Sequence, residues 1–236
     1  MIFFRNLNLF LCAICAGFVL AVDVNLDIKP TLKNQKIQKE IIKKLKEDHF
    51  FKVNNIEDIN NIFQEKLIES LDPSKVYFTK LEFEQYGNNL NDESFDLNNS
   101  FRILNKYFNR LVEATSYQIE ILKDFNFDFS KSEYMDIYSD DNEWKSSFTE
   151  LRKEWFLLAK NDLLNEILDE DLSDETDSRQ TIIDRYERRI RRITQRTNED
   201  YFSIIMNNFT SQFDPHSAYL SPKSAEDFDM QMSLSL

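Results

Sequence analysis

The sequence predicts an all-α protein made of several helices, with one unpaired β-strand beginning at its carboxyl terminus. Apolar residues recur every three to four positions along most of the chain, which is the period of a helix with one buried face. Of the 236 residues only 2 are Gly and 4 are Pro, so the residues that interrupt helices are scarce. The shortage of Gly also excludes folds that hold nucleotides in glycine-rich loops.

The first residues have the composition of an export signal. Arg5 supplies a positive charge, residues 7–20 are apolar except for Asn8, and Ala21 offers a small residue for cleavage. The apolar run is shorter than the ~20 residues that span a bilayer. We therefore expect residues 1–21 to be a cleaved signal peptide and the mature chain to be periplasmic. An uncleaved segment, as the alternative, would be its only contact with the membrane.

Few metal ligands are available. The only cysteines, Cys12 and Cys15, lie inside the export segment, and the only histidines are His49 and His216. Zinc sites use sets of three or four His, Cys or carboxylate ligands. The sequence therefore predicts no metal and no cofactor.

Three helices are predicted in the first half of the mature chain. They cover residues 33–50, a segment around residues 56–67, and residues 101–123. The expected buried face of the first helix consists of Ile37, Ile41 and Leu45. That of the second consists of Ile56, Ile59, Phe63 and Leu67. That of the third consists of Leu104, Phe108, Leu111 and Leu122.

The strongest apolar stripe follows in the next helix. At 100° per residue its members point within an arc of roughly 80°. No convergent polar group accompanies them, so we expect packing in the core and not a ligand pocket. The stripe consists of Trp144, Phe148, Leu151, Trp155 and Leu158.

An arginine-rich helix is predicted over residues 176–196, after the acidic residues 169–177. Its apolar face consists of Ile182, Tyr186, Ile190 and Ile193, and arginines cover much of the rest. The net charge of −13 and the export signal argue against binding of nucleic acid. We expect the helix to bind carboxylates of the chain itself or of an acidic partner protein. The candidate docking residues are Arg185, Arg188, Arg189 and Arg192.

The last helix of this helical region begins at Thr197. Asp200 stands three residues later and completes a capping box. The helix must end before Asp214, because a residue that precedes Pro disfavours the helical conformation. Its apolar face consists of Phe202, Ile205, Met206 and Phe209.

Two segments, residues 71–79 and 213–221, share one pattern. Each has an apolar residue, Asp-Pro, three variable positions, an aromatic residue, an apolar residue and a hydroxyl residue. The pattern predicts a helix end, a short extended link with an inward aromatic ring, and a new helix capped by Thr79 or Ser221. Glu82 would complete a capping box with Thr79. We interpret the likeness as a recurrent structural solution, with chance as the alternative.

Asp214, His216 and Ser217 are the residue types of a hydrolase triad. They are close neighbours on one turn, whereas a triad needs side chains that converge from separate elements. No glycines near them could form an oxyanion hole. We therefore interpret them as a structural turn and predict no catalytic residue in this chain.

The end of the chain alternates apolar and polar residues from Met230 to Leu236. This period of two predicts a strand with one apolar face. No upstream segment could pair with it, so we expect a β-containing region to follow Leu236 and residues 230–236 to be mobile.

The stretch Arg185–Leu236 resembles the tail-specific (carboxy-terminal processing) serine proteases, at the segment that joins their N-terminal helical domain to the PDZ domain. Met232–Leu236 resembles the strand at which the PDZ region begins. The resemblance divides the mature chain into a helical domain, residues 22–212, and a linker, residues 213–236. The residues that resemble the family signature are Asp214, Pro215, His216, Ser217, Tyr219, Leu220, Ser221 and Pro222.

This resemblance implies a periplasmic endopeptidase that recognises apolar carboxyl termini through a PDZ domain and cleaves with a Ser nucleophile and a Lys base. No residue of this chain matches those groups, so we expect it to be inactive alone. The implied role is control of access to the protease, with protein substrates and an adaptor lipoprotein as partners. The alternative is an independent, exported helical module for protein–protein interaction.

Overall fold

The computed structural model describes residues 25–48, 56–87, 95–134, 142–168 and 175–234, and the predicted signal peptide lies outside these ranges. Within them the chain forms eight helices and one isolated β-bridge, between Thr79 and Lys145. The all-α prediction is confirmed. The helices are α1 Leu32–Glu47, α2 Ile56–Leu71, α3 Lys80–Gly87, α4 Leu97–Asp124, α5 Phe148–Ile167, α6 Glu175–Thr194, α7 Asn198–Thr210 and α8 Pro222–Leu234.

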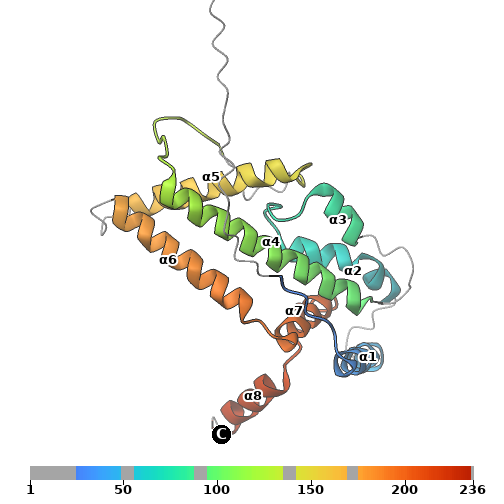
Figure 1. The fold of residues 1–236 in the computed structure, drawn as a ribbon. Coiled ribbons are helices and arrows are strands. Elements are labelled where there is room, and N and C mark those ends of the chain that lie inside the picture. The colour runs from blue at the N-terminus through green and yellow to red at the C-terminus, as the bar shows by residue number, and fades with distance from the viewer. Residues whose placement is uncertain (1–24, 49–55, 88–94, 135–141, 169–174, 235–236) are drawn as a thin grey trace, which may run out of the picture.

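The long helix α4 runs through the middle of the molecule (Figure 1). It packs against α2 and α7 near its start and against α5 and α6 near its end. Figure 1 places α1 at the edge of this arrangement and shows α8 projecting from it. The helix α4 is therefore the common support of two groups of helices.

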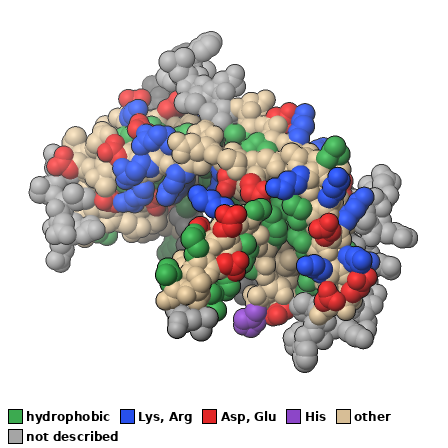
Figure 2. Space-filling model, turned by 90° about the horizontal axis from the view of Figure 1, so that it is seen from below, with side chains coloured by type: hydrophobic (Ala, Val, Ile, Leu, Met, Phe, Trp, Pro, Cys, Tyr) green, Lys and Arg blue, Asp and Glu red, His purple; other side chains and the backbone are tan. Residues whose placement is uncertain are grey.

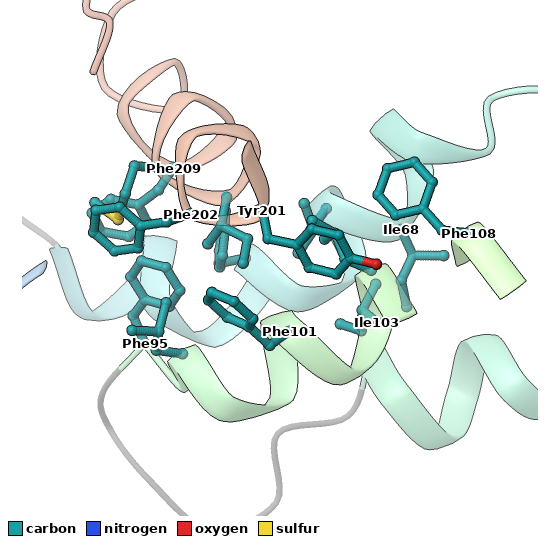
Figure 3. Packing of buried hydrophobic residues seen from close by; sticks show 14 of the residues in the cluster. Ile68, Phe95, Phe101, Ile103, Phe108, Tyr201, Phe202 and Phe209 are labelled. Carbon is teal, nitrogen blue, oxygen red and sulfur yellow. The ribbon is translucent and has the colours of Figure 1, made fainter. Parts of the chain in front are cut away.

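The larger core lies between α2, α4 and α7. Figure 3 shows Tyr201, Phe202 and Phe209 of α7 pointing toward Phe101 of α4 and toward Phe95, which precedes it. All five side chains are buried. The apolar face predicted for α7 is therefore confirmed, and so is its capping box between Thr197 and Asp200.

The predicted aromatic stripe is divided between two elements. Ser147 caps α5 and accepts a hydrogen bond from the Glu150 N–H at 3.3 Å, so the helix begins at Phe148. Leu151 and Trp155 are fully buried, as predicted, whereas Phe148 of the same stripe is 37% exposed. The prediction that Trp144 belongs to the same helix is wrong. Its ring precedes the cap and stacks on Phe83 of α3 at 4.6 Å between centroids.

The first Asp-Pro segment forms the predicted corner between α2 and α3. The buried carboxylate of Asp72 accepts hydrogen bonds from the N–H groups of Val76, Tyr77 and Phe78, at 2.9, 2.7 and 3.0 Å. The indole N–H of Trp155 donates to the Val76 carbonyl at 2.7 Å. One carboxylate thus fixes the corner, and one indole attaches α5 to it.

The helix that follows this corner is capped as predicted. Thr79 and Glu82 exchange the two hydrogen bonds of a capping box, at 2.9 and 3.3 Å. Glu82 also contacts Lys106 and Arg110 of α4, at 2.6 and 2.8 Å. Burial opposes ionisation of Glu82, but the hydrogen bonds from Lys106 and Thr79 and the charge of Arg110 outweigh it and lower its pKa. The cap therefore also attaches α3 to α4.

Two asparagines of α4 hold the extended segment before α1. The Asn109 side chain accepts from the Leu26 N–H at 2.8 Å and donates to the Leu26 carbonyl at 2.9 Å. Asn105 pairs in the same way with Ile28, at 3.1 and 2.8 Å. These side chains satisfy backbone groups that a neighbouring strand would otherwise pair. The sequence patterns do not reveal this contact.

The prediction of a strand from Met230 is wrong for the residues that the structure describes. Residues 222–234 form α8, and residues 235–236 lie outside the described ranges. A helix satisfies its backbone hydrogen bonds internally, whereas a lone strand leaves them unpaired. The apolar residues stay at the surface: Phe228, Met230, Met232 and Leu234 are all more than half exposed.

Candidate partner-binding cleft

The signature corner joins α7 to α8. The Ser217 N–H donates to the Asp214 carbonyl at 2.9 Å, as the Lys75 N–H does to the Asp72 carbonyl at 3.0 Å in the first corner. Asp214 Oδ1 also accepts from the His216 N–H at 3.1 Å. Both Asp-Pro segments therefore share this hydrogen bond, but Lys75 has a positive φ of 54° and Ser217 does not. Only the first one uses a buried carboxylate to hold the link that follows.

Asp214, His216 and Ser217, the residue types of a hydrolase triad, all lie on this turn. His216 Nδ1 lies 3.0 Å from Asp214 Oδ1, but the His216 side chain is 90% exposed. A catalytic imidazole needs a fixed, partly enclosed position between its partners. The Asp–His contact therefore supports the interpretation as a turn.

Tyr219 anchors the signature segment on α7. Its N–H donates to Asn207 Oδ1 at 2.7 Å, its hydroxyl donates to Glu199 at 2.9 Å, and its ring meets Phe202 edge-on. Burial and the Glu199 carboxylate raise the pKa of its hydroxyl, which stays protonated at neutral pH. The aromatic position of the pattern thus points inward, as expected.

After this anchor the chain exposes Leu220 and starts α8. The Ser221 hydroxyl accepts from the Ser224 N–H at 3.2 Å, which makes Ser221 the predicted cap with Pro222 as the first helical residue. Pro215 is exposed. The signature therefore consists of one turn, one anchor and one cap.

The four candidate docking arginines of α6 do not form one group. Arg185 pairs with Glu166 of α5 at 2.6 Å. Arg188 is exposed and lies outside the cleft described next. Arg189 and Arg192 line that cleft, and Arg196, just beyond α6, joins them. Lys and Arg side chains gather on the part of the surface that α6 forms (Figure 2).

This cleft, which we call the arginine cleft, has a volume of about 620 Å³. It lies between α4, the end of α6, α7 and the Asp72 corner. Besides the three arginines, its walls are mainly aromatic and aliphatic. They consist of Ser70, Leu71, Tyr77, Tyr107, Phe108, Leu111, Ile193 and Ile204.

Two guanidinium groups of the cleft are held by aromatic rings. Arg196 lies 4.5 Å from the ring centroid of Phe108, and Arg189 lies 4.9 Å from that of Tyr186. Among the described residues, no carboxylate lies within 4.0 Å of Arg189, Arg192 or Arg196. The buried Nε of Arg196 has no hydrogen-bond partner in that part of the chain. These cations are therefore available to an added anion.

Two phenols add hydrogen-bond donors to the cleft. The rings of Tyr77 and Tyr107 meet edge-on at 5.6 Å. Burial raises the pKa of Tyr77 to about 12, although the charge of Arg189 opposes this, and burial also raises the pKa of Tyr107. Both hydroxyls are therefore protonated at neutral pH and can donate to an anion. Tyr107 was not predicted, although it lies three residues after Leu104 and four before Leu111 on the predicted face.

The comparisons with known proteins identify the family. A sequence model of the family described as "Tail specific protease N-terminal domain" matches residues 41–223. The chain belongs to this family. The resemblance found in the sequence is thus confirmed, and the N-terminal domain match includes both the arginine cleft and the signature corner.

A relative with the name "Tail-specific protease", from Haemophilus influenzae (strain ATCC 51907 / DSM 11121 / KW20 / Rd), is 26% identical to the chain over 227 residues. The alignment covers 89% of this chain and 32% of the relative. The chain thus spans about a third of the length of this tail-specific protease.

The described part of this tail-specific protease N-terminal domain contains no cluster of three or more His, Cys, Asp or Glu side chains that could hold a metal ion. No helix in the same ranges is both long and apolar enough to cross a membrane.

Proposed function

We propose that this chain is the helical N-terminal region of an exported, periplasmic serine endopeptidase that degrades proteins from apolar carboxyl termini. The family match over residues 41–223 is the observation that supports this proposal. The chain contributes binding and control of access. The Ser nucleophile and Lys base that the family resemblance implies have no counterpart among its residues.

The arrangement of the helices suits such a role. The core around α4 gives a fixed support, and the arginine cleft presents three cations beside an apolar wall. A concave surface with a few charged groups is typical of a binding site. The proposed partners are protein substrates and an adaptor lipoprotein, with no nucleic acid.

The same cleft also supports the second candidate, an independent exported module for protein–protein interaction. Both candidates use the α6 surface for binding. They differ in whether binding serves proteolysis, so measurements of cleavage and not of affinity separate them.

Export is the part of the proposal that can be tested first. In Gram-negative cells that produce the full chain, we expect periplasmic protein that begins at Val22, because Ala21 is the small residue at the cleavage site. Fractionation followed by N-terminal sequencing measures this. Ala21→Phe, as a control, should retain the longer form. Unprocessed protein in the cytoplasmic fraction would contradict export.

A further inference from the structure

We propose that the arginine cleft binds an acidic segment of a protein partner in which carboxylates alternate with aliphatic or aromatic side chains. The inference rests on the proposed function and deepens it, because it names the chemistry of the partner that the α6 surface binds. The supporting observations are the spacing of the cations, their lack of carboxylate partners and the apolar wall beside them.

The cations are spread along the cleft. Arg189 and Arg192 are separated by roughly 4.5 Å along α6, at about 1.5 Å of rise per residue, and Arg196 lies just beyond the end of this helix. Side chains on one face of an extended peptide repeat every ~6.8 Å. Two alternate carboxylates of such a segment can therefore pair with different arginines of the cleft.

The arginines of the cleft differ from others on the same helix. Arg179 and Arg185 each have a carboxylate at 2.6 Å. The cleft arginines have none within 4.0 Å among the described residues. Arginine forms paired hydrogen bonds with carboxylates. The cleft therefore offers strong donors that the described part of the chain does not use.

The apolar wall of the arginine cleft favours a ligand that carries apolar side chains in addition to negative charge. Leu111, Ile193 and Ile204 give it an apolar surface, and the phenols of Tyr77 and Tyr107 add neutral donors beside the cations. An acidic segment without apolar residues would leave that surface in contact with water. The net charge of −13 disfavours binding of the same segment elsewhere on the chain.

Calorimetry on the full chain tests this inference. The probe is the peptide Gly-Glu-Leu-Asp-Phe-Glu-Gly with blocked ends, and the control peptide has Gln and Asn in place of Glu and Asp. We expect the acidic peptide to bind about tenfold more tightly than its amide counterpart, and more weakly as the salt concentration rises. Equal affinities for the two peptides would overturn the proposal.

Paired variants locate the site. Arg189→Gln with Arg192→Gln should weaken binding of the acidic peptide about tenfold. Arg188→Gln with Arg191→Gln removes the same charge from exposed positions of the same helix and should leave binding unchanged. Equal losses in both variants would overturn the assignment to the cleft. Far-ultraviolet circular dichroism confirms that each variant keeps its helices.

Competition with other anions tests whether the cleft prefers an acidic peptide to a small anion or a nucleic acid. Citrate or a single-stranded RNA that displaced the peptide at an equal concentration would assign the cleft to small anions or nucleic acid and would contradict the proposal. None of these results depends on export or proteolysis. A failure here therefore leaves the proposed function standing, and it is distinguishable from a failure of the export test.

Discussion

Trp155→Ala is expected to lower the free energy of unfolding by about 4 kcal/mol. The Trp155 side chain is fully buried beside Ala114 and Leu151, so its removal leaves a large cavity. It also leaves the Val76 carbonyl without the indole donor that now lies 2.7 Å away. Both losses fall where α5 meets α4 and the Asp72 corner.

Urea denaturation followed by circular dichroism measures this change, and the thermal midpoint should fall by roughly 10 °C. Trp155→Phe keeps most of the ring but not the N–H, so about 2 kcal/mol is expected. Trp144→Ala is the matched control, because the second tryptophan of the chain is only half-buried and should cost less than about 2 kcal/mol. Equal effects for the two Trp→Ala variants would contradict the packing described for α5.

Asp72→Ala is expected to cost about 3 kcal/mol. The change removes the acceptor of three backbone N–H groups, two of which belong to the buried residues Val76 and Phe78. Leaving buried donors unpaired costs more than the net value of the hydrogen bonds. The corner should therefore loosen and release the contact of α5 with it.

The second Asp-Pro corner provides the comparison for this prediction. Asp214 keeps 24% of its side chain exposed, and water can replace it as an acceptor for the His216 N–H. Asp214→Ala should therefore cost about 1 kcal/mol or less. Denaturation of both variants under one condition gives the difference. Similar costs at the two corners would contradict a special role of the buried carboxylate.

Local signals in the sequence predict most of the helices and their caps. The faces of α4 and α7 follow the helical period, and the caps at Thr79, Thr197 and Ser221 follow the preferences of the first turn. These signals act over a few residues. They therefore do not depend on how the helices come together.

The errors arise where contacts distant in sequence decide the structure. Trp144 has the right period for α5, but Ser147 caps the helix and the ring packs on Phe83 of another element. The alternation from Met230 resembles a strand, yet with no partner strand in the described residues the backbone forms α8.

Only part of the candidate site could be predicted from the sequence, because the rest depends on contacts between residues that are distant in sequence. The composition of α6 identifies its arginines. The choice between Arg189 and Arg185 depends on Glu166, which belongs to a different helix and pairs with Arg185. The contribution of Tyr77 and Tyr107 depends on the packing of the Asp72 corner against α4.

The proposed function assigns binding of proteins and control of access to this helical region, and no cleavage of peptide bonds. The most direct test incubates the purified chain with an unfolded protein that ends in apolar residues and follows the substrate by intact mass spectrometry. We expect the substrate mass to stay unchanged over hours. Fragments that disappear when His216 or Ser217 is replaced by Ala would contradict the claim.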